Sequence, residues 1–522
     1  MIESAFSRRM LLRGTGGIGL AALLAACGVD AENTAGPAGG PPKSGGTLRV
    51  GTPAPPTAVD PVTMYDGSAI AIVQLVADYL IWLENDFSLT PRLAEKWAAE
   101  DGNKRWVFTL RAGVTFSDGT PLDATAVKAS FDRLLDPAQD SAALAAFKSV
   151  LSAGGVSTRD ASTVVFTLDR AFSDFPFLVS AGNYNAVILK ADYAGAFTDH
   201  AIGTGPFLLG GYDPSTGATF TRNPKYWQPG KPYLDGVEIK FYADAQAEQL
   251  ALGSGEIDAL VITDPSIIQE TGDVVLDKVP GTAMTALTLR VDQAPFDRKE
   301  VRQAIAYALD RPALNEVVDA GIAQLGNDHL YAPLFAAGPK DIPQRAKDPA
   351  KVKELLAAAG VGKLSFPLSF DPPSKNFALA VQDQLRQAGI EVTLDQQTSK
   401  AFYGGDQAKD TPWLFTPANL VGWAGRPAPS QFVRPMVTSD GVWNGAKYRN
   451  PRLDAALVAY DGATSDDERK RQAKIIADVL HEDVPVVLAL WNGAVRAYNK
   501  TRFTGIKAHP SSFVDFSAVS RA

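Results

Sequence analysis

The side chains best suited to chemistry are widely spaced, and their spacing favours no catalytic or metal site. The four histidines form no HxH or HExxH pattern, and the pairs Gly230-Lys231 and Gly362-Lys363 lack the Ser or Thr of a phosphate loop. The chain has no GxSxG elbow and no SxxK motif. A metal site made of one histidine and carboxylates has no spacing that would identify it among 58 acidic residues. The same holds for a pair of catalytic carboxylates, as in a glycosidase. We therefore predict no enzymatic activity, no metal and no cofactor. The histidines are His200, His329, His481 and His509.

The stretch 411–450 instead collects residues suited to binding. It has no regular period, is rich in Pro and Gly, and carries Trp413, Trp423 and Trp443. Large aromatic faces on irregular backbone commonly line ligand pockets. Arg426 follows closely, and a guanidinium can hold carboxylate, phosphate or sulfonate through a bidentate fork. Two alternatives stay open: the tryptophans pack in the core, and Arg426 is a rim charge that faces water.

Composition limits the possible partners. A length of 522 residues suggests roughly three domain-sized units, and 46% hydrophobic residues provide ample core. The net charge of −8 argues against nucleic acid, because no basic field is available to displace phosphate counterions.

The N-terminus predicts export and anchoring. Arg8 and Arg9 precede an apolar run, residues 16–26, that is too short to span a membrane, which needs ~20 apolar residues. The run ends at Cys27, the only cysteine, in the sequence LAACG, which looks like a lipoprotein signal. The paired arginines resemble a twin-arginine export signal; the alternative is a basic start used by general secretion. Residues 28–44 read as a Gly/Pro/Ala tether.

The remaining chain alternates helix and strand signals. Residues 348–394 read as helix, strand, helix, strand, which favours a parallel sheet with crossover helices. Gly360 and Gly389 stand where helices end. Other predicted helices are 68–83, 123–135, 299–309, 451–460 and 466–482, and predicted strands are 47–51, 106–110, 206–212, 218–222, 237–241 and 485–490.

Several motifs carry a family resemblance. The segments GTGPF, RNPKYW and LALGSGEIDAL follow one another between Gly203 and Leu260, and LAEKW, FTLRAGVTFSDGTPL and SFDRLLDP lie between Leu93 and Pro137. Together they resemble the family 5 solute-binding proteins of ABC importers, from Gly45 to the C-terminus. The resemblance implies an α/β fold of the two-lobed, periplasmic-binding-protein type, in the large cluster C form of type II. It places the first lobe at 45–285 with a subdomain inserted at about 66–198, the second lobe at 286–487, and a return to the first lobe at 488–522.

The resemblance also points to cleft residues. In peptide-binding members, an acidic stretch after Gly-Trp supplies an Asp that pairs with the ligand's α-ammonium. Here Arg426 and Ala428 stand in that neighbourhood. This departure favours an anionic ligand, unless another acid such as Asp66 or Asp440 takes the ammonium. The predicted ligand-binding residues are Trp413, Trp423, Arg426, Trp443 and Asn444 in the second lobe, and Tyr65, Asp66, Asn183 and Tyr184 in the first.

The resulting prediction is a membrane-anchored, extracytoplasmic substrate-binding lipoprotein of an ABC importer. As a monomer, it would capture a small solute between its lobes and deliver it to a permease with ATPase subunits. The solute is expected to be anionic or aromatic rather than a peptide. The alternatives are a di- or oligopeptide receptor, a sensor or chaperone-like lipoprotein without a transport role, and, last, a hydrolase.

Overall fold

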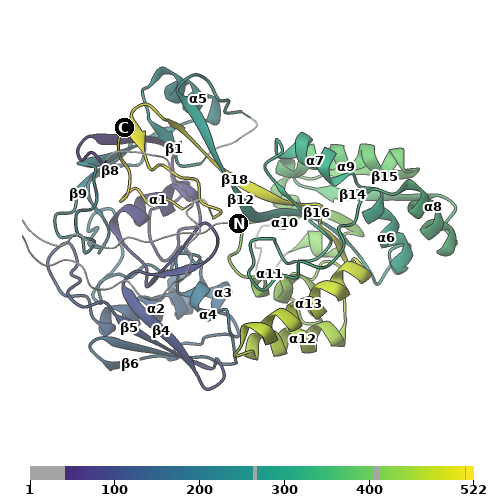
Figure 1. Cartoon of the computed structure of the whole chain (residues 1–522), viewed down its shortest axis with the longest axis horizontal. Coiled ribbons are helices and arrows are strands. Elements are labelled where there is room, and N and C mark those ends of the chain that lie inside the picture. Colours follow the sequence, from purple (N-terminus) through teal and green to yellow (C-terminus); the bar gives the residue numbers. More distant parts are fainter. Residues whose placement is uncertain (1–40, 263–266, 405–410, 512) are drawn as a thin grey trace, which may run out of the picture. The chain divides into compact units, whose positions relative to one another are not determined.

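One long strand, β12 (Val274–Leu289), belongs to both halves of a large mixed sheet. Its first part, Val274 to Ala283, pairs with β18 (Leu490–Asn499). Its last part, Met284 to Leu289, pairs with β16 (Ala418–Trp423). In Figure 1, β12 and β18 run together between the elements around β1 and those around β14. The sheet therefore continues from one lobe into the other through β12 and its partner β18, which also pairs with β11 and β13.

The computed structural model describes residues 41–262, 267–404, 411–511 and 513–522, and residues 43–522 form one unit by themselves. The predicted export and lipidation residues Arg8, Arg9 and Cys27 lie outside the described residues, as does most of the tether. Among the helices of the described ranges, none has the length and apolarity needed to cross a membrane.

The first lobe is built on β1 (Thr47–Pro53), whose neighbours β10 and β11 run parallel to it. The strand order of the whole sheet is β15-β14-β16-β12-β18-β11-β1-β10-β9-β8, with β13 paired to β18 and β17 to β12. The remaining strands of this sheet are β8 (Phe207–Asp213), β9 (Gly217–Arg222), β10 (Gly236–Tyr242), β11 (Ala259–Leu260), β13 (Gln324–Leu325), β14 (Leu364–Phe370), β15 (Ile390–Gln396) and β17 (Val486–Val487).

Helix α1 (Gly67–Val76) is shorter than the sequence predicts. The prediction of one amphipathic helix over 68–83 is wrong: the helix ends at Val76, and β2 (Ile81–Leu83) follows. The segment that begins at Gly203 packs directly against this end, because Gly205 N donates to the carbonyl of Val76 at 2.8 Å. A side chain at Gly203 would overlap the same carbonyl. A contact with a distant segment thus ends the helix, and nearly all of its residues are buried.

A separate four-stranded antiparallel sheet, in the order β4-β5-β7-β6, lies within the predicted insertion. The alternating burial of β5 (Arg105–Leu110) confirms the predicted strand, and helix α2 (Ala124–Leu135) begins at the predicted cap, Asp123. The other elements here are β3 (Leu89–Pro91), β4 (Ala94–Glu100), β6 (Val156–Asp160), β7 (Thr163–Thr167), the 3-10 helix η1 (Pro137–Gln139), α3 (Leu144–Phe147) and α4 (Phe175–Leu178).

The second lobe has the predicted parallel strands. Strand β14 pairs in parallel with both β15 and β16, and helices α8 and α9 end where Gly360 and Gly389 adopt left-handed φ values of 64° and 81°. The predicted strand 485–490 is instead divided, because Gly326 N and Asp328 bond to Ala489 and Leu488 between β17 and β18.

The other elements of the second lobe are α6 (Lys299–Tyr307), α7 (Arg311–Val318), α8 (Pro349–Ala358), η2 (Pro372–Ser374), α9 (Lys375–Gln387), α10 (Ser399–Tyr403) and η3 (Pro412–Phe415). Three further elements, α5 (Ala245–Ser254), β19 (Phe503–Thr504) and β20 (Ser520–Arg521), lie with the first lobe.

Three helices connect this lobe to the insertion through a buried charge network. Asp461 pairs with Arg170 at 2.6 Å and with Arg434, and Asp174 pairs with Arg469. Both aspartates are almost fully buried, and burial raises the pKa of Asp461 while the two arginines lower it. The apolar residues of these helices share one buried cluster with the first lobe. The helices are α11 (Ser430–Val437), α12 (Pro451–Gly462) and α13 (Asp466–Asp483).

We expect Asp461→Ala to lower the free energy of unfolding by about 3–5 kcal/mol, because it leaves two guanidinium groups without their buried partner. Denaturant unfolding measures the change. Asp383→Ala is the matched control, because its pair with Arg386 is exposed and its loss should cost less than about 1 kcal/mol. Equal effects of the two substitutions would show that the buried network is not stabilising.

Buried histidines predict acid sensitivity. His509 Nε2 donates to Leu83 O at 2.8 Å, its Nδ1 accepts from Ser511 N, and burial lowers the pKa of His509 to about 4. The unfolded chain, with a pKa near 6.5, takes up a proton that the folded chain excludes, so stability falls as pH drops from about 6.5 to about 4. We expect His509→Gln to remove about 3 kcal/mol of this pH dependence in unfolding measured at pH 7 and pH 4. The exposed His200→Gln should leave it intact.

Candidate functional site

The three tryptophans predicted to bind ligand pack against one another at the end of β16. The Trp423 ring lies edge-to-face with those of Trp413 and Trp443, at centroid distances of 6.4 and 5.7 Å. Trp413 is buried against Phe402, whereas Trp423 and Trp443 are only partly buried. The Trp423 Nε1 atom is buried, and within the described part of the chain it has no hydrogen-bond partner. The cluster therefore offers two indole faces and one unused donor.

The side chain of Thr282 holds the backbone of Arg426. Its N–H donates to Thr282 Oγ1 at 3.1 Å, and the same hydroxyl donates to the carbonyl of Arg426 at 2.8 Å. Thr282 lies in β12 at the register shift. The half-buried guanidinium pairs with no carboxylate in the described ranges, and burial lowers the pKa of Arg426. Arginine stays protonated in proteins, so this is a cation without a counter-charge.

A loop of the first lobe lies between Arg426 and Asp66. Asn185 Nδ2 donates to the carbonyls of Pro61 and Met64 at 2.9 and 3.0 Å, which ties the loop to the segment before Asp66. At its other end, a Cβ on Gly182 would lie 2.8 Å from Pro427 Cγ. Tyr184 occupies the middle of this loop. Burial raises the pKa of its phenol, Arg426 lowers it, and Asp66 raises it. Tyr184 therefore lies within the electrostatic influence of both Arg426 and Asp66.

Asp66 has one oxygen engaged and one unused. Oδ1 caps helix α1 by accepting from Ser68 N and Ala69 N at 3.1 and 2.9 Å. Oδ2 is buried and has no partner among the described residues. Asp66 also raises the pKa of Tyr212, on β8, after the larger effect of burial. The charge of Asp66 thus acts on both phenols, and that of Arg426 acts on Tyr184.

Comparison with known proteins identifies the family. Residues 88–444 match the family described as "Bacterial extracellular solute-binding proteins, family 5 Middle". The chain belongs to this family. It is 27% identical over 485 residues to the glutathione-binding protein GsiB of Escherichia coli strain K12, covering 88% of this chain and 91% of that one.

Solved structures show the same fold. The ABC transporter substrate-binding protein CtaP of Listeria monocytogenes is 23% identical, with a TM-score of 0.78 over 92% of this chain and all of that one. The protein AgaA of A. tumefaciens R10, in complex with agropinic acid, is 25% identical, with a TM-score of 0.71 over 91% and 99%. Family 5 members are extracytoplasmic binding proteins that serve ABC permeases and their ATPases, and they take up peptides, glutathione, nickel or other solutes. The chain is a two-lobed α/β solute-binding protein of this family.

Other residues predicted for the family 5 site have structural partners instead. The Asn444 amide donates to Thr438 O and Tyr448 O and accepts from Tyr448 N, so it holds its own loop together. Asn183 is buried and donates to Leu178 O at 2.9 Å. Tyr65 is 59% exposed and lies beside Asp66 in the chain.

The second acid considered for an ammonium group, Asp440, does not join the cluster. It accepts from Thr438 Oγ1 at 2.8 Å, and its charge acts on Arg170 in the network of Asp461. Sequence reasoning missed two residues of the cluster, Thr282 and Tyr212. Each reads as an ordinary strand residue, and only the fold brings it to the site.

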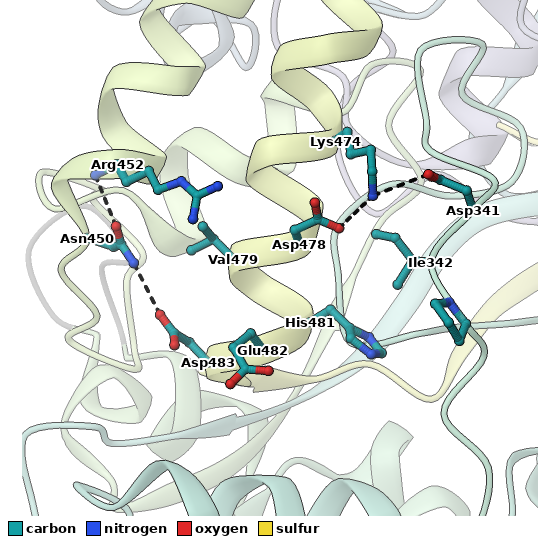
Figure 2. A pocket seen from close by; sticks show the side chains of 11 residues that line it. Asp341, Ile342, Asn450, Arg452, Lys474, Asp478, Val479, His481, Glu482 and Asp483 are labelled. Carbon is teal, nitrogen blue, oxygen red and sulfur yellow. Dashed lines mark hydrogen bonds and ion pairs between the residues drawn. The ribbon is translucent and has the colours of Figure 1, made fainter.

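A hollow of about 550 Å³ lies elsewhere, along α13. Figure 2 shows its walls, where Lys474 bridges Asp478 and Asp341 at 2.9 and 3.4 Å. It shares no lining residue with the cluster around Arg426, and its charged groups largely pair with one another. In the described ranges, no three His, Cys, Asp or Glu side chains are placed to hold a metal ion.

The two kinds of tryptophan predict different responses to substitution. We expect Trp413→Ala to lower the free energy of unfolding by about 3–5 kcal/mol, because it empties a buried position. Trp423→Phe should change stability by less than about 1 kcal/mol, because it removes an N–H that has no partner. Urea unfolding of both variants measures this. Destabilisation of Trp423→Phe to the extent of Trp413→Ala would assign Trp423 to the core.

Proposed function

We propose that this protein is the membrane-anchored solute-binding component of an ABC importer, and that its ligand is a small anionic or aromatic solute. The observation that carries this proposal is Arg426, a half-buried cation without a carboxylate partner among the described residues. It lies three residues after Trp423, whose partly buried ring packs against that of Trp443. An unpaired buried charge destabilises a protein unless something compensates it. A carboxylate, phosphate or sulfonate of the ligand provides that compensation.

Binding uses capture and closure. The first lobe (45–285, with its insertion at about 66–198) supplies Asp66 and Tyr184, and the second lobe (286–487) supplies Arg426 and Trp423. Residues 488–522 return to the first lobe, so β12 and β18 form the hinge. The ligand favours the closed form by its differential affinity for that form. No covalent step is involved, and the protein is not an enzyme.

The N-terminal residues place this protein at a membrane. Arg8 and Arg9 direct export, Cys27 receives the lipid and becomes the first residue of the mature chain, and residues 28–44 are the tether. Each buried lipid CH₂ contributes about 0.8 kcal/mol to anchoring, so a multiply acylated cysteine holds the chain firmly. The mature protein acts as a monomer that docks on its permease.

A peptide receptor is the second candidate. It is favoured by the relatives, which include a glutathione-binding protein, and by the free oxygen of Asp66, an acceptor suited to an ammonium group. It differs from the main proposal in what it requires of the ligand: a free amine is essential, and Arg426 is secondary.

Thermal unfolding of the chain without residues 1–27 distinguishes the two. The panel contains aromatic acids, phosphorylated solutes, sugars, nickel chelates, and peptides with free or acetylated N-termini. A ligand at 100 times its Kd stabilises the folded chain by about 2.7 kcal/mol, a readable shift in the midpoint. We expect acids to raise the midpoint and Arg426→Ala to abolish the effect.

Arg452→Ala is the matched control, because Arg452 is exposed and lines the hollow along α13. It should bind ligand like the unmodified protein. If only free-amine peptides shift the midpoint, and Arg426→Ala still responds, the peptide receptor replaces the main proposal. A panel without any effect contradicts both.

A further inference from the structure

Two side chains of the insertion reach across to the second lobe. Arg170 pairs with Asp461 of α12 at 2.6 Å. Asp174 accepts from Ser430 Oγ of α11 at 2.7 Å and pairs with Arg469 of α13. None of these five residues lies in the hinge strands β12 and β18. We call this contact of Arg170 and Asp174 with the three helices the seam.

Each side of the seam is fixed to its own lobe. At the end of α13, Glu482 O accepts from Gln303 Nε2 of α6 at 2.8 Å. In the insertion, Asp78 Oδ2 accepts from Trp227 Nε1 at 3.1 Å, which ties the insertion to the rest of the first lobe. Figure 1 shows α13 extending from the insertion, near α4, toward α6. Two bodies joined by a hinge move apart only when the contacts between them elsewhere break, so opening of the lobes requires the seam to open.

Backbone groups take part in the seam as well. Ser173 N donates to Asp461 O at 2.8 Å, and Ser173 Oγ donates to Tyr460 O at 3.2 Å. Asn103 Nδ2 donates to Ala463 O at 2.7 Å. The direct contacts of the seam are thus mainly ion pairs and hydrogen bonds, as in interfaces between domains that move relative to one another.

The polar groups of the seam are incompletely satisfied. Four polar atoms in the seam or beside it are buried and have no hydrogen-bond partner within the described ranges: Asp461 Oδ1, Arg434 Nε, Arg469 Nε and the hydroxyl of Tyr331, whose ring packs against that of Tyr460. Burying such an atom costs about 1–3 kcal/mol, and removing charges from water offsets much of the attraction within an ion pair. Opening gives these groups back to water. The closed seam is therefore favoured only by a small difference between its bonds and its desolvation.

We propose that the seam is a latch that sets how often the ligand-free protein closes, with both open and closed forms populated before a solute arrives. The inference rests on the proposed function, in which a solute enters while the lobes are apart. It goes beyond that function, because the seam contains none of the residues predicted to bind ligand. A protein whose binding-competent form is only partly populated binds every solute more weakly by that fraction. The latch therefore tunes affinity without touching the solute.

A disulfide across the seam tests whether it opens. A Cβ built on Gly462 lies 3.9 Å from the Cβ of Ala171, within the range of about 3.5–4.5 Å that disulfides use. The chain without residues 1–27 has no other cysteine, so Ala171→Cys combined with Gly462→Cys introduces its only two thiols. Small-angle X-ray scattering measures the radius of gyration of this ligand-free double variant, first oxidised and then reduced with dithiothreitol. We expect a smaller radius when it is oxidised, and a loss of the thermal shift given by solutes of the panel, which returns on reduction.

Asp174→Asn weakens the latch without removing a bond inside either lobe, because both side-chain bonds of Asp174 cross the seam. We expect a larger radius of gyration for the ligand-free chain, and about 10-fold weaker binding of a panel solute, as the loss of a charged hydrogen bond from the closed form implies. The oxidised cysteine pair should restore the small radius in this variant, which a misfolded chain would not show. Asp123→Asn is the control, because Asp123 caps α2 inside the insertion by accepting from Ala126 N at 3.0 Å. It should change neither quantity.

The outcomes separate the latch from the function beneath it. Equal radii for the oxidised and reduced cysteine pair would show that the seam stays closed, and the latch would be wrong whether or not a solute binds. An unchanged radius and affinity in Asp174→Asn would also refute it. If no solute of the panel binds the unmodified chain, the proposed function falls, and the scattering of the ligand-free protein still decides whether the seam opens.

Discussion

The candidate site depends on one strand, β12, that pairs with β18 along its first part and with β16 and β17 along its last part. Because β12 passes from β18 to β16, its register shift between Val279 and Ala283 falls where the sheet changes lobes. Thr282 lies at this shift, and its hydroxyl bonds both the N–H and the carbonyl of Arg426. These hydrogen bonds fix the Arg426 backbone where the chain leaves β16. A fixed backbone reduces the conformational freedom that the chain loses when a ligand arrives.

Several buried charges elsewhere in the described part of the protein are neutralised by direct partners. Asp461 and Asp328 each contact two arginines, and Asp258 contacts Arg49 and Arg502. The buried guanidinium of Arg496 lacks a carboxylate contact in the described ranges, but its Nη atoms donate to the carbonyls of Leu260 and Phe513 at 3.0 Å. Burial lowers the pKa of Arg496 to about 10.

Arg426 and Asp66 Oδ2 are not the only such groups, because Glu248 Oε1 and Trp106 Nε1 are also buried without a partner in the described ranges. Arg426 and Asp66 are distinguished by their neighbours: Arg426 follows the partly buried Trp423 in the chain, and both charges act on Tyr184. Aromatic surface with a few polar groups is typical of ligand pockets.

Much of the fold could be predicted from the sequence, because its signals are local. The left-handed glycines at 360 and 389, the alternation of β5 and the cap of α2 act over a few residues. The predictions that failed involve distant contacts: the loop at Gly203 ends α1, and Asp328 divides the strand at 485–490. The candidate site shows the same contrast between predictable local signals and unpredictable distant contacts. Local composition indicated Trp423 and Arg426. The loop that contacts both Pro427 and the segment before Asp66 depends on Gly182 and Asn185, whose contacts no spacing reveals.

A site divided between two lobes constrains its ligand by energy as well as by charge. Moving a two-state equilibrium from 1:99 to 99:1 requires about 5.5 kcal/mol of differential affinity. A ligand that touches one lobe alone binds open and closed forms equally and shifts nothing. Hydrogen bonds to charged groups contribute about 1.5–3 kcal/mol each, so one such bond on each lobe supplies most of this amount. Apolar contact adds to it. A ligand that bonds to both lobes therefore makes closure favourable.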